Sequence, residues 1–539
     1  MTERPVTAIV TAAAIRPGYQ PGQKPFRHIV ISGGKVVALT HTAAQAGRAA
    51  HAVDRSPAFR VDLGSACIGP GLIDTHIHAL QAAADVRLAG LREARTVADV
   101  LAAVRRAGLR RPAGRWTVTG RNWHESQLRE GRLPTRAELD ALGLPGPLMV
   151  RRGSHLGVPN SRAAVLLGEQ AAGEAPLTDD ALIARALALA GPPTADERRE
   201  DLAAVLRRLA ALGLTSIREA GVDAAELDLF RALRAQGRLP LRCDLLWRVA
   251  EGSDPGSARE QIAAMPRPGP DGDPYLRLTG VKAFVDGRIA DAAIEGSGPE
   301  AFRMAPGELW PIVTEALRRG GGVGCHAVGD AAVRMVLDAY ERALADGLAR
   351  DPGRLVIEHA LDCAPDTVAR LAAAGVGVSA HPGIIYEFAG EVRRHWGAGR
   401  AARAAPLRDL LAAGVRVAAG SDGDVPPSAP LRVIWFMAGR EGRSGGPIGG
   451  GQSVPRDAAF DLYTRRAADL LGVVTHRSVL EPGADADLVA FAADPLSGPL
   501  DDLPGLEIML TLVGGRPVHD PAGLLAGQTA GLTEEAGGG

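Results

Sequence analysis

The sequence has no excess of either charge, no paired cysteines and no long apolar run. Its 539 residues include 61 basic and 62 acidic side chains, a net charge of −1, which argues against nucleic acid or an anionic membrane as a partner. The four cysteines are far apart and form no CxxC pair, as is typical of reduced thiols in a cytoplasmic protein. No stretch reaches 18 consecutive apolar residues, so we expect no transmembrane helix. The sequence therefore predicts a cytoplasmic globular protein.

Lysine is nearly absent. Only Lys24, Lys35 and Lys282 are lysines among the 61 basic residues, and the rest are arginines. Where arginine replaces lysine almost everywhere, a retained lysine can be one whose amine is needed. Lys24 and Lys35 near the N-terminus are compatible with chance, whereas Lys282 lies in an apolar segment, LTGVKAFVDG.

A helix that ends in glycine and is followed by an apolar strand recurs along the chain. Examples are LAALGLTSI (209–217), LAAAGVGVSA (371–380) and LLAAGVRVAAGSD (410–422). Glycine supplies the left-handed helix cap, and the β-branched run predicts a buried parallel strand. We count eight such strands and predict an α/β fold, a (β/α)8 TIM-like barrel. The expected strands are 70–78, 214–219, 241–248, 276–285, 321–327, 354–360, 376–381 and 415–421.

The two chain ends resemble each other. HIVISGGKVVAL (28–39) and MLTLVGGRPV (509–518) each place a Gly-Gly turn between alternating apolar segments, which predicts two hairpins of one small β-sandwich. We expect this domain to comprise residues 1–68 and 476–525, the barrel to span 69–475, and 526–539 to be a disordered tail. The long interval between the first two barrel strands predicts an insertion at about 80–195.

The first barrel strand, PGLIDTHIHA, ends in His76 and His78. A period of two directs both imidazoles to one side, where two neutral imidazoles can bind a divalent ion such as zinc. The alternative is a pair of core histidines bonded to backbone carbonyls. Further polar side chains at the carboxyl ends of other predicted strands favour the metal, because barrel enzymes place their reactive groups there. These side chains are Lys282, His326, His359 and Asp422.

The order HxH, Lys, His, His, Asp resembles the amidohydrolase superfamily, and the chain is most similar to its amidohydrolase-3 (YtcJ-like) branch. The motifs are PGLIDTHIHA, VKAFVDG, HAVGD, IEHA, LLAAGVRVAAGSD and GADADLV, with WHES and GSHLGVPNS in the insertion. The resemblance covers nearly the whole chain. It implies a metal-dependent hydrolase with one or two metal ions per chain, of which zinc is the expected one.

The resemblance also suggests roles for individual residues. In related enzymes a lysine at the position of Lys282 is carboxylated and bridges two metals, and a desolvated lysine near cations can lose its proton as this requires. The alternative is a charged Lys282 paired with Asp286. Asp422 would be a metal ligand and the catalytic proton shuttle, with a helix N-cap as its alternative role. Residues predicted to bind substrate are Trp123, His155, Asn160 and His381.

Two departures from the branch fall where substrate would sit. His381-Pro382 stands where Gln-Pro is usual, and DGRIADAAI (286–294) replaces a more polar stretch, so no relative's substrate can be transferred. We expect hydrolysis of a non-peptide carbon–nitrogen bond in a small molecule, such as an N-acyl, N-formyl or cyclic amide. The alternatives are a deaminase, an esterase or lactonase, or an inactive metal-binding scaffold. A homodimer is compatible with such a barrel, but no residue indicates one.

Overall fold

The computed structural model describes residues 7–525 apart from 21, 23, 56–57, 113, 122, 154–155, 169–172, 268–272, 424–428, 444–445 and 474–476. The predicted tail, 526–539, lies outside the described residues. The chain divides into two compact units: one comprises the described residues within 1–78, 206–422 and 427–539, and the other those within 79–205 and 423–426. Among the described residues, no helix is both long and apolar enough to cross a membrane.

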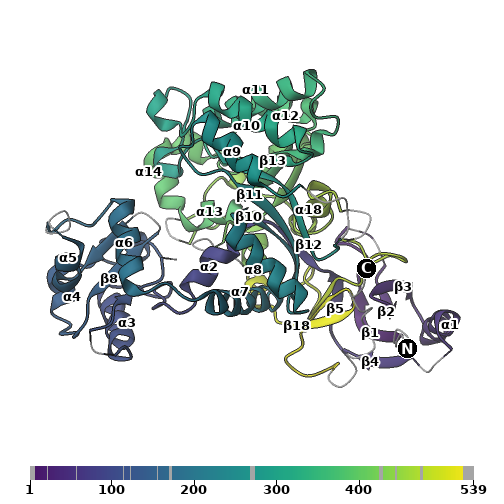
Figure 1. Ribbon diagram of the computed structural model, residues 1–539. Helices are drawn as coiled ribbons and strands as arrows, with labels where there is room; N and C mark the ends of the chain where they lie inside the picture. The colour runs from purple at the N-terminus through teal and green to yellow at the C-terminus, as the bar shows by residue number, and fades with distance from the viewer. Residues whose placement is uncertain are drawn as a thin grey trace. The chain divides into compact units, whose positions relative to one another are not determined.

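Eight parallel strands of the first unit form one sheet, in the order β16-β15-β14-β13-β12-β11-β10-β6. The predicted barrel fold is confirmed, because each expected strand is present within a few residues of its predicted bounds. Figure 1 shows β10, β11, β12 and β13 side by side. The strands are β6 (Leu72–Ile77), β10 (Leu214–Val222), β11 (Arg242–Arg248), β12 (Leu276–Phe284), β13 (Gly322–Ala327), β14 (Leu355–His359), β15 (Gly377–Ala380) and β16 (Arg416–Ala419).

The first and last strands of this sheet meet through loop and side-chain hydrogen bonds. The backbone N–H of Asp422 donates to the carbonyl of His76 at 2.8 Å. The Asp74 carboxylate accepts from the backbone N–H groups of His76, at 3.1 Å, and Ser421, at 3.0 Å. These bonds nearly close the barrel and fix the ends of β6 and β16 beside each other.

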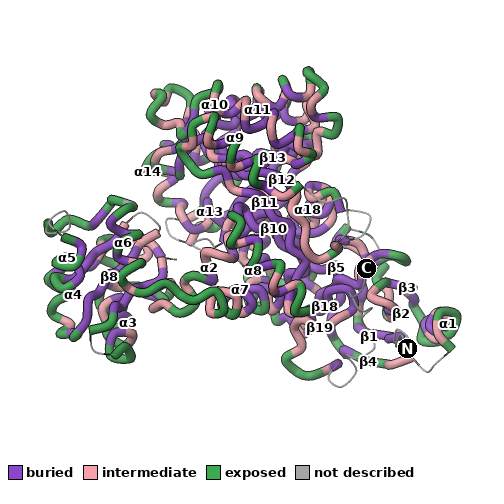
Figure 2. The backbone as a smooth tube through the Cα atoms, viewed as in Figure 1, coloured by how far each residue is buried: buried purple, intermediate pink, exposed green. Residues whose placement is uncertain are grey.

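Helices follow the barrel strands and cover them. Figure 2 shows buried residues along the strands and exposed residues on the helices. Gly375 ends α12 in the left-handed conformation, at φ 66°, as the Leu-Ala-Ala-x-Gly pattern predicts. The helices are α8 (Ala224–Ala235), α9 (Pro255–Ala264), α10 (Pro306–Arg318), α11 (Asp330–Ala345), α12 (Pro365–Ala374), α13 (Pro382–Glu387), α14 (Ala389–Ala401), α15 (Leu407–Ala412), α16 (Pro430–Gly439), α17 (Arg456–Leu462) and α18 (Arg465–Leu470).

Both chain ends contribute to a second, mixed sheet of eight strands. The predicted hairpins are β2–β3 and β18–β19, and the Gly-Gly pair in each turn takes positive φ at both residues, as a tight hairpin requires. Apolar side chains of N-terminal and C-terminal strands share one core. The strands are β1 (Ala8–Ile15), β2 (Phe26–Ser32), β3 (Lys35–Thr40), β4 (Phe59–Asp62), β5 (Cys67–Pro70), β17 (Leu488–Phe491), β18 (Ile508–Val513) and β19 (Arg516–His519), with helix α1 (Ala43–Val53).

The second unit has its own core and a three-stranded sheet of order β7-β8-β9. Its strands are β7 (Thr117–Val118), β8 (Leu148–Arg152) and β9 (Leu156–Pro159). Its helices are α2 (Ala79–Asp85), α3 (Val97–Leu109), α4 (Arg136–Asp140), α5 (Ser161–Leu167) and α6 (Asp180–Ala190), and α7 (Ala195–Ala210) leads back to the barrel.

Candidate metal centre

His76, His78 and Asp422 converge at the carboxyl end of the barrel. The Nε2 atoms of His76 and His78 each lie 3.2 Å from Oδ1 of Asp422. A tetrahedral zinc ion with bonds of about 2.0–2.2 Å places its ligand atoms about 3.3 Å apart. The three side chains therefore fit a single ion of that size, and each offers one ligand atom to it.

Asp422 faces the two histidines because the chain turns sharply after β16, with Asp422 itself at φ 52°. A non-glycine residue in this left-handed conformation is strained and is held by its surroundings, a feature common at functional sites. Burial alone would raise the pKa of Asp422, but the nearby His76 and His78 imidazoles hold it well below its usual value. The side chain is thus a carboxylate at neutral pH, as metal binding requires.

His326 and His359 end the neighbouring strands β13 and β14, and their ring centroids are 4.3 Å apart. The Nε2 atom of His326 lies 2.9 Å from the carbonyl of Gly287, so an N–H there leaves Nδ1 free to bind a metal. His359 is fully buried, and among the described residues its Nε2 atom has no hydrogen-bond partner. A buried polar atom without a partner is costly, and a metal ion would supply the missing contact.

Lys282 is fully buried on β12, and its Nζ atom has no hydrogen-bond partner among the described residues. Burial lowers its pKa to about 8, although the negative charges of Glu358 and Asp422 oppose this shift. The alternative pairing with Asp286 is not observed. Asp286 instead accepts the backbone N–H groups of Ala293, Val328 and Gly329. A large fraction of Lys282 is therefore neutral near pH 8.

Glu358 is a buried member of the site that the sequence analysis missed. Its Oε2 atom lies 2.7 Å from Nδ1 of His76, and its Oε1 atom lies 2.6 Å from Arg218. Burial would raise the pKa of Glu358, but the charge of Arg218 and the contact with His76 hold it well below its usual range. The carboxylate can therefore accept the Nδ1–H of His76 and leave Nε2 directed at Asp422. The sequence signal was a charged residue inside the apolar strand LVIEHA.

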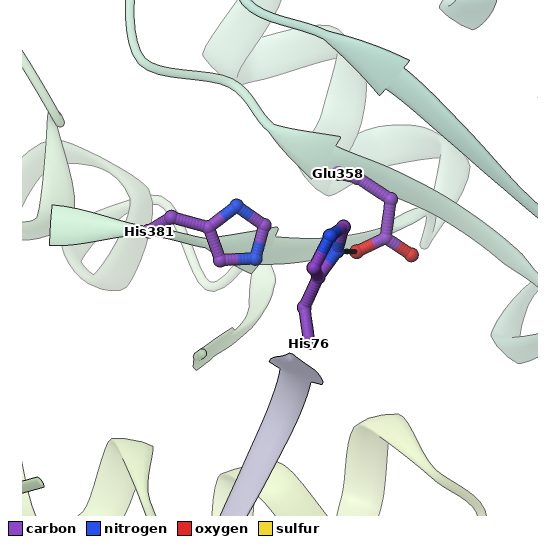
Figure 3. Close-up of side chains that lie close together, drawn as sticks. All are labelled: His76, Glu358 and His381. Atoms are coloured by element: carbon purple, nitrogen blue, oxygen red, sulfur yellow. Dashed lines mark hydrogen bonds and ion pairs between the residues drawn. The ribbon is translucent and has the colours of Figure 1, made fainter. Parts of the chain in front are cut away.

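His381 follows β15 and is also fully buried. Figure 3 shows its ring beside that of His76, with Glu358 on another side of His76, and one atom of each residue lies within 4.8 Å of the others. This group could in principle hold an ion. We interpret it instead as a support for the neighbouring ligands, because the Glu358 carboxylate already lies against His76 and Arg218.

Two other residues predicted to contact substrate, Trp123 and Asn160, belong to the second unit. Trp123 lies in the core of the second unit, and its indole N–H donates to the Arg151 carbonyl at 2.5 Å. The Asn160 side chain caps helix α5, accepting from the N–H of Ala163. Both side chains thus have structural roles, which gives no support to their predicted contact with substrate. His155 lies outside the described residues.

The chain is similar to several known hydrolases. An N-substituted formamide deformylase of Arthrobacter pascens is 28% identical over 524 residues, 90% of this chain and 94% of that protein. The putative amidohydrolase YtcJ of Bacillus subtilis is 23% identical, covering 85% of this chain and 90% of its own length. The crystal structure of an uncharacterized metal-dependent hydrolase from Pyrococcus furiosus matches the fold with a TM-score of 0.71 at 23% identity, over 91% of this chain and all of that one.

The model of the amidohydrolase family matches residues 60–519, most of the chain. This range contains the barrel and every residue of the site described above. The chain therefore belongs to the amidohydrolase family and is an enzyme that hydrolyses carbon–nitrogen bonds other than peptide bonds.

Proposed function

We propose that this protein hydrolyses the amide bond of a small N-acyl, N-formyl or cyclic amide with the help of a divalent metal ion. The observation that carries the proposal is the convergence of His76, His78 and Asp422 on one point, with their ligand atoms 3.2 Å apart. Because an N-substituted formamide deformylase is among the similar proteins, N-formyl amides are the first substrates to test. We also propose that the protein is cytoplasmic and acts on its substrate as a single chain or a homodimer.

The residues present would hold one or two ions. Nitrogen and carboxylate donors suit zinc, so zinc is the ion we propose. His76, His78 and Asp422 would bind one ion, and His326, His359 and Lys282 offer ligand atoms for a second. When bound, the ion lowers the pKa of a water ligand from about 15.7 to about 7 and polarises the substrate carbonyl.

We propose that Lys282 reacts with carbon dioxide, and the anion that results would help to hold a second ion. The neutral amine forms a nitrogen–carbon bond to carbon dioxide and releases one proton, which leaves a negatively charged carbamate. The lowered pKa of Lys282, about 8, supports this reaction because only the neutral amine is nucleophilic. Arginine could not replace it, since guanidinium stays protonated in proteins.

Asp422 is the proposed proton carrier. Its carboxylate is charged at neutral pH and lies against both histidines of β6. It would accept a proton from the attacking water and return it to the leaving nitrogen, so that the product departs as a neutral amine. The carbon–oxygen bond forms first, the carbon–nitrogen bond breaks when the nitrogen receives the proton, and the products are a carboxylic acid and an amine.

A substrate screen tests this function. The purified protein, supplied with zinc and bicarbonate, is incubated with N-formyl, N-acyl and cyclic amides, and the released amine is measured. We expect turnover of at least one amide class and a kcat lower by about 10²- to 10⁴-fold in Asp422→Asn. Release of ammonia from a heterocycle would instead identify a deaminase, and turnover of esters or lactones alone would identify an esterase. No turnover by a zinc-loaded protein in any class would favour an inactive scaffold.

A further inference from the structure

We propose that His381 is a positioning residue that fixes the orientation and tautomer of His359, so that Nε2 of His359 is presented to the metal. The inference rests on the proposed metal-dependent function. It differs from the substrate-binding role that the sequence suggested for His381, because the structure gives both of its ring nitrogens other partners.

The contacts of His381 form a continuous chain inside the barrel. Its Nδ1 atom lies 2.6 Å from Nδ1 of His359, and its Nε2 atom lies 3.2 Å from Oγ of Ser379. The Ser379 hydroxyl in turn lies 2.7 Å from that of Thr75 on β6. All four side chains are buried, and no water competes for these contacts at a buried position.

The direction of the hydrogen bonds follows from the chemistry of imidazole. A neutral imidazole carries one N–H, and a His359 that binds metal through Nε2 must carry it on Nδ1. Its Nδ1–H then donates to Nδ1 of His381, which is left with its own proton on Nε2. That N–H donates to Ser379, whose hydroxyl donates to Thr75. The reversed chain would also give each contact a donor and an acceptor, but it would place the proton of His359 on Nε2, where it blocks metal binding.

His359 has a particular need for such support. It lies at φ 81°, in the left-handed conformation that a residue with a side chain rarely adopts. Its ring is packed between His326 and His381, with centroid distances of 4.3 and 4.4 Å. Because the backbone turns at this residue, strand geometry alone does not set the direction of the ring. His381 provides the hydrogen bond that does.

His381 also lies too close to its partners to serve as an independent ligand. A metal bound at Nδ1 of His381 would have to displace the contact with His359, and one bound at Nε2 would displace Ser379. We infer that the side chain acts through His359. The cost of losing such a supporting contact in known metal sites is about a 10- to 100-fold loss of metal affinity or activity.

The test compares three variants of the full chain. His381→Leu removes both ring nitrogens of His381 and keeps a side chain of similar volume. Ser379→Ala removes the hydroxyl that contacts Nε2 of His381 but leaves Nδ1 of His381 as the acceptor for His359. His381→Gln keeps an acceptor for His359 and a donor for Ser379. Zinc affinity is measured by competition with a chromophoric chelator, and the visible spectrum of the cobalt-substituted protein reports the ligand geometry. Circular dichroism and thermal unfolding check that each variant is folded.

We expect His381→Leu to lower the metal affinity about 10- to 100-fold and to change the cobalt spectrum. Ser379→Ala should show a smaller loss in the same direction, and His381→Gln should recover most of the affinity and the wild-type spectrum. Wild-type affinity and spectrum in a folded His381→Leu protein would overturn the positioning role. If His381→Leu does not fold, a Ser379→Ala protein with the metal affinity and cobalt spectrum of the wild type would overturn the positioning role. A wild-type protein that binds no zinc or cobalt would instead overturn the proposed function, so the two failures are distinct.

Discussion

Oε2 of Glu358 lies 2.7 Å from Nδ1 of His76, and neither side chain has any surface exposed to solvent. The other oxygen of the same carboxylate lies 2.6 Å from Arg218. One buried carboxylate thus contacts the imidazole of a proposed metal ligand and neutralises a buried guanidinium. The proposed metal site would therefore depend on residues beyond its ligands, as is usual for histidine ligands in proteins.

We expect Glu358→Gln to destabilise the fold by about 3–5 kcal/mol, because it leaves the charge of Arg218 buried without a counter-charge. The folded state lowers the pKa of Glu358, so the carboxylate stabilises the protein at pH values above its unfolded pKa of about 4.3 and this stabilisation is lost as the pH falls. Urea unfolding from pH 7 to pH 3 should show the largest difference between variant and wild type at pH 7.

The matched control for this experiment is Asp228→Asn, which removes a carboxylate from an exposed ion pair with Arg231 on helix α8. Exposed pairs contribute little to stability, so this variant should unfold like the wild type. A Glu358→Gln protein as stable as Asp228→Asn at pH 7 would contradict the account of the buried pair.

Gly324 on β13 leaves the space that Glu358 occupies. A Cβ atom at this position would lie 2.6 Å from Oε1 of Glu358 and 3.1 Å from Leu246. We expect Gly324→Ala to displace the carboxylate, to destabilise the fold by about 1–3 kcal/mol through overpacking, and to weaken zinc binding. Isothermal titration with zinc and urea unfolding measure the two effects.

Gly390 in helix α14 serves as the control, because a Cβ atom there meets nothing within 4 Å. Gly390→Ala should keep the wild-type zinc affinity and gain about 0.5–1 kcal/mol from the better helix propensity of alanine. Equal zinc affinities in the two alanine variants would show that the position of Glu358 does not matter to the site.

Reaction of Lys282 with carbon dioxide should depend on pH. Burial lowers the pKa of Lys282 to about 8, against about 10.4 for an ordinary lysine. The neutral amine, and with it the carbamate, should increase as the pH rises through 8. Native mass spectrometry in bicarbonate at pH 7 and pH 9 should show one carbon dioxide adduct, more abundant at pH 9.

The adduct should persist in Lys24→Ala, which removes an exposed lysine, and should be absent in Lys282→Ala. An adduct of equal abundance in both variants would place the reaction on another amine. The absence of any adduct in the wild type would leave Lys282 as a buried amine and exclude a carbamate ligand.

Much of the barrel could be predicted from the sequence because glycine caps and apolar runs mark its elements. The interval 354–360, for example, contains β14, Leu355–His359. His76, His78, His326, His359 and Asp422 could be proposed as a group because each stands at or beside the carboxyl end of a strand. The fold rule that places reactive groups at that end needs no knowledge of side-chain contacts.

Glu358 and His381 could not be assigned in the same way. Strand alternation predicts that Glu358 and His359 point to opposite faces, but the positive φ of His359 breaks the alternation and both side chains lie near His76. The contact between His381 and His359 depends on the register of β14 against β15, where His359 pairs with Ala380. Neither a local backbone turn nor a register is visible in the composition of the two strands.

The most direct test of the account is the zinc content of the protein, measured by inductively coupled plasma mass spectrometry after purification without chelator, beside that of His76→Ala. Circular dichroism confirms that the variant is folded. The account predicts one or two equivalents of zinc per chain in the wild type and a clear loss in His76→Ala, because that variant removes a proposed ligand whose Nε2 atom lies 3.2 Å from Asp422. Wild-type protein that holds no divalent metal, even after reconstitution with zinc, would contradict it.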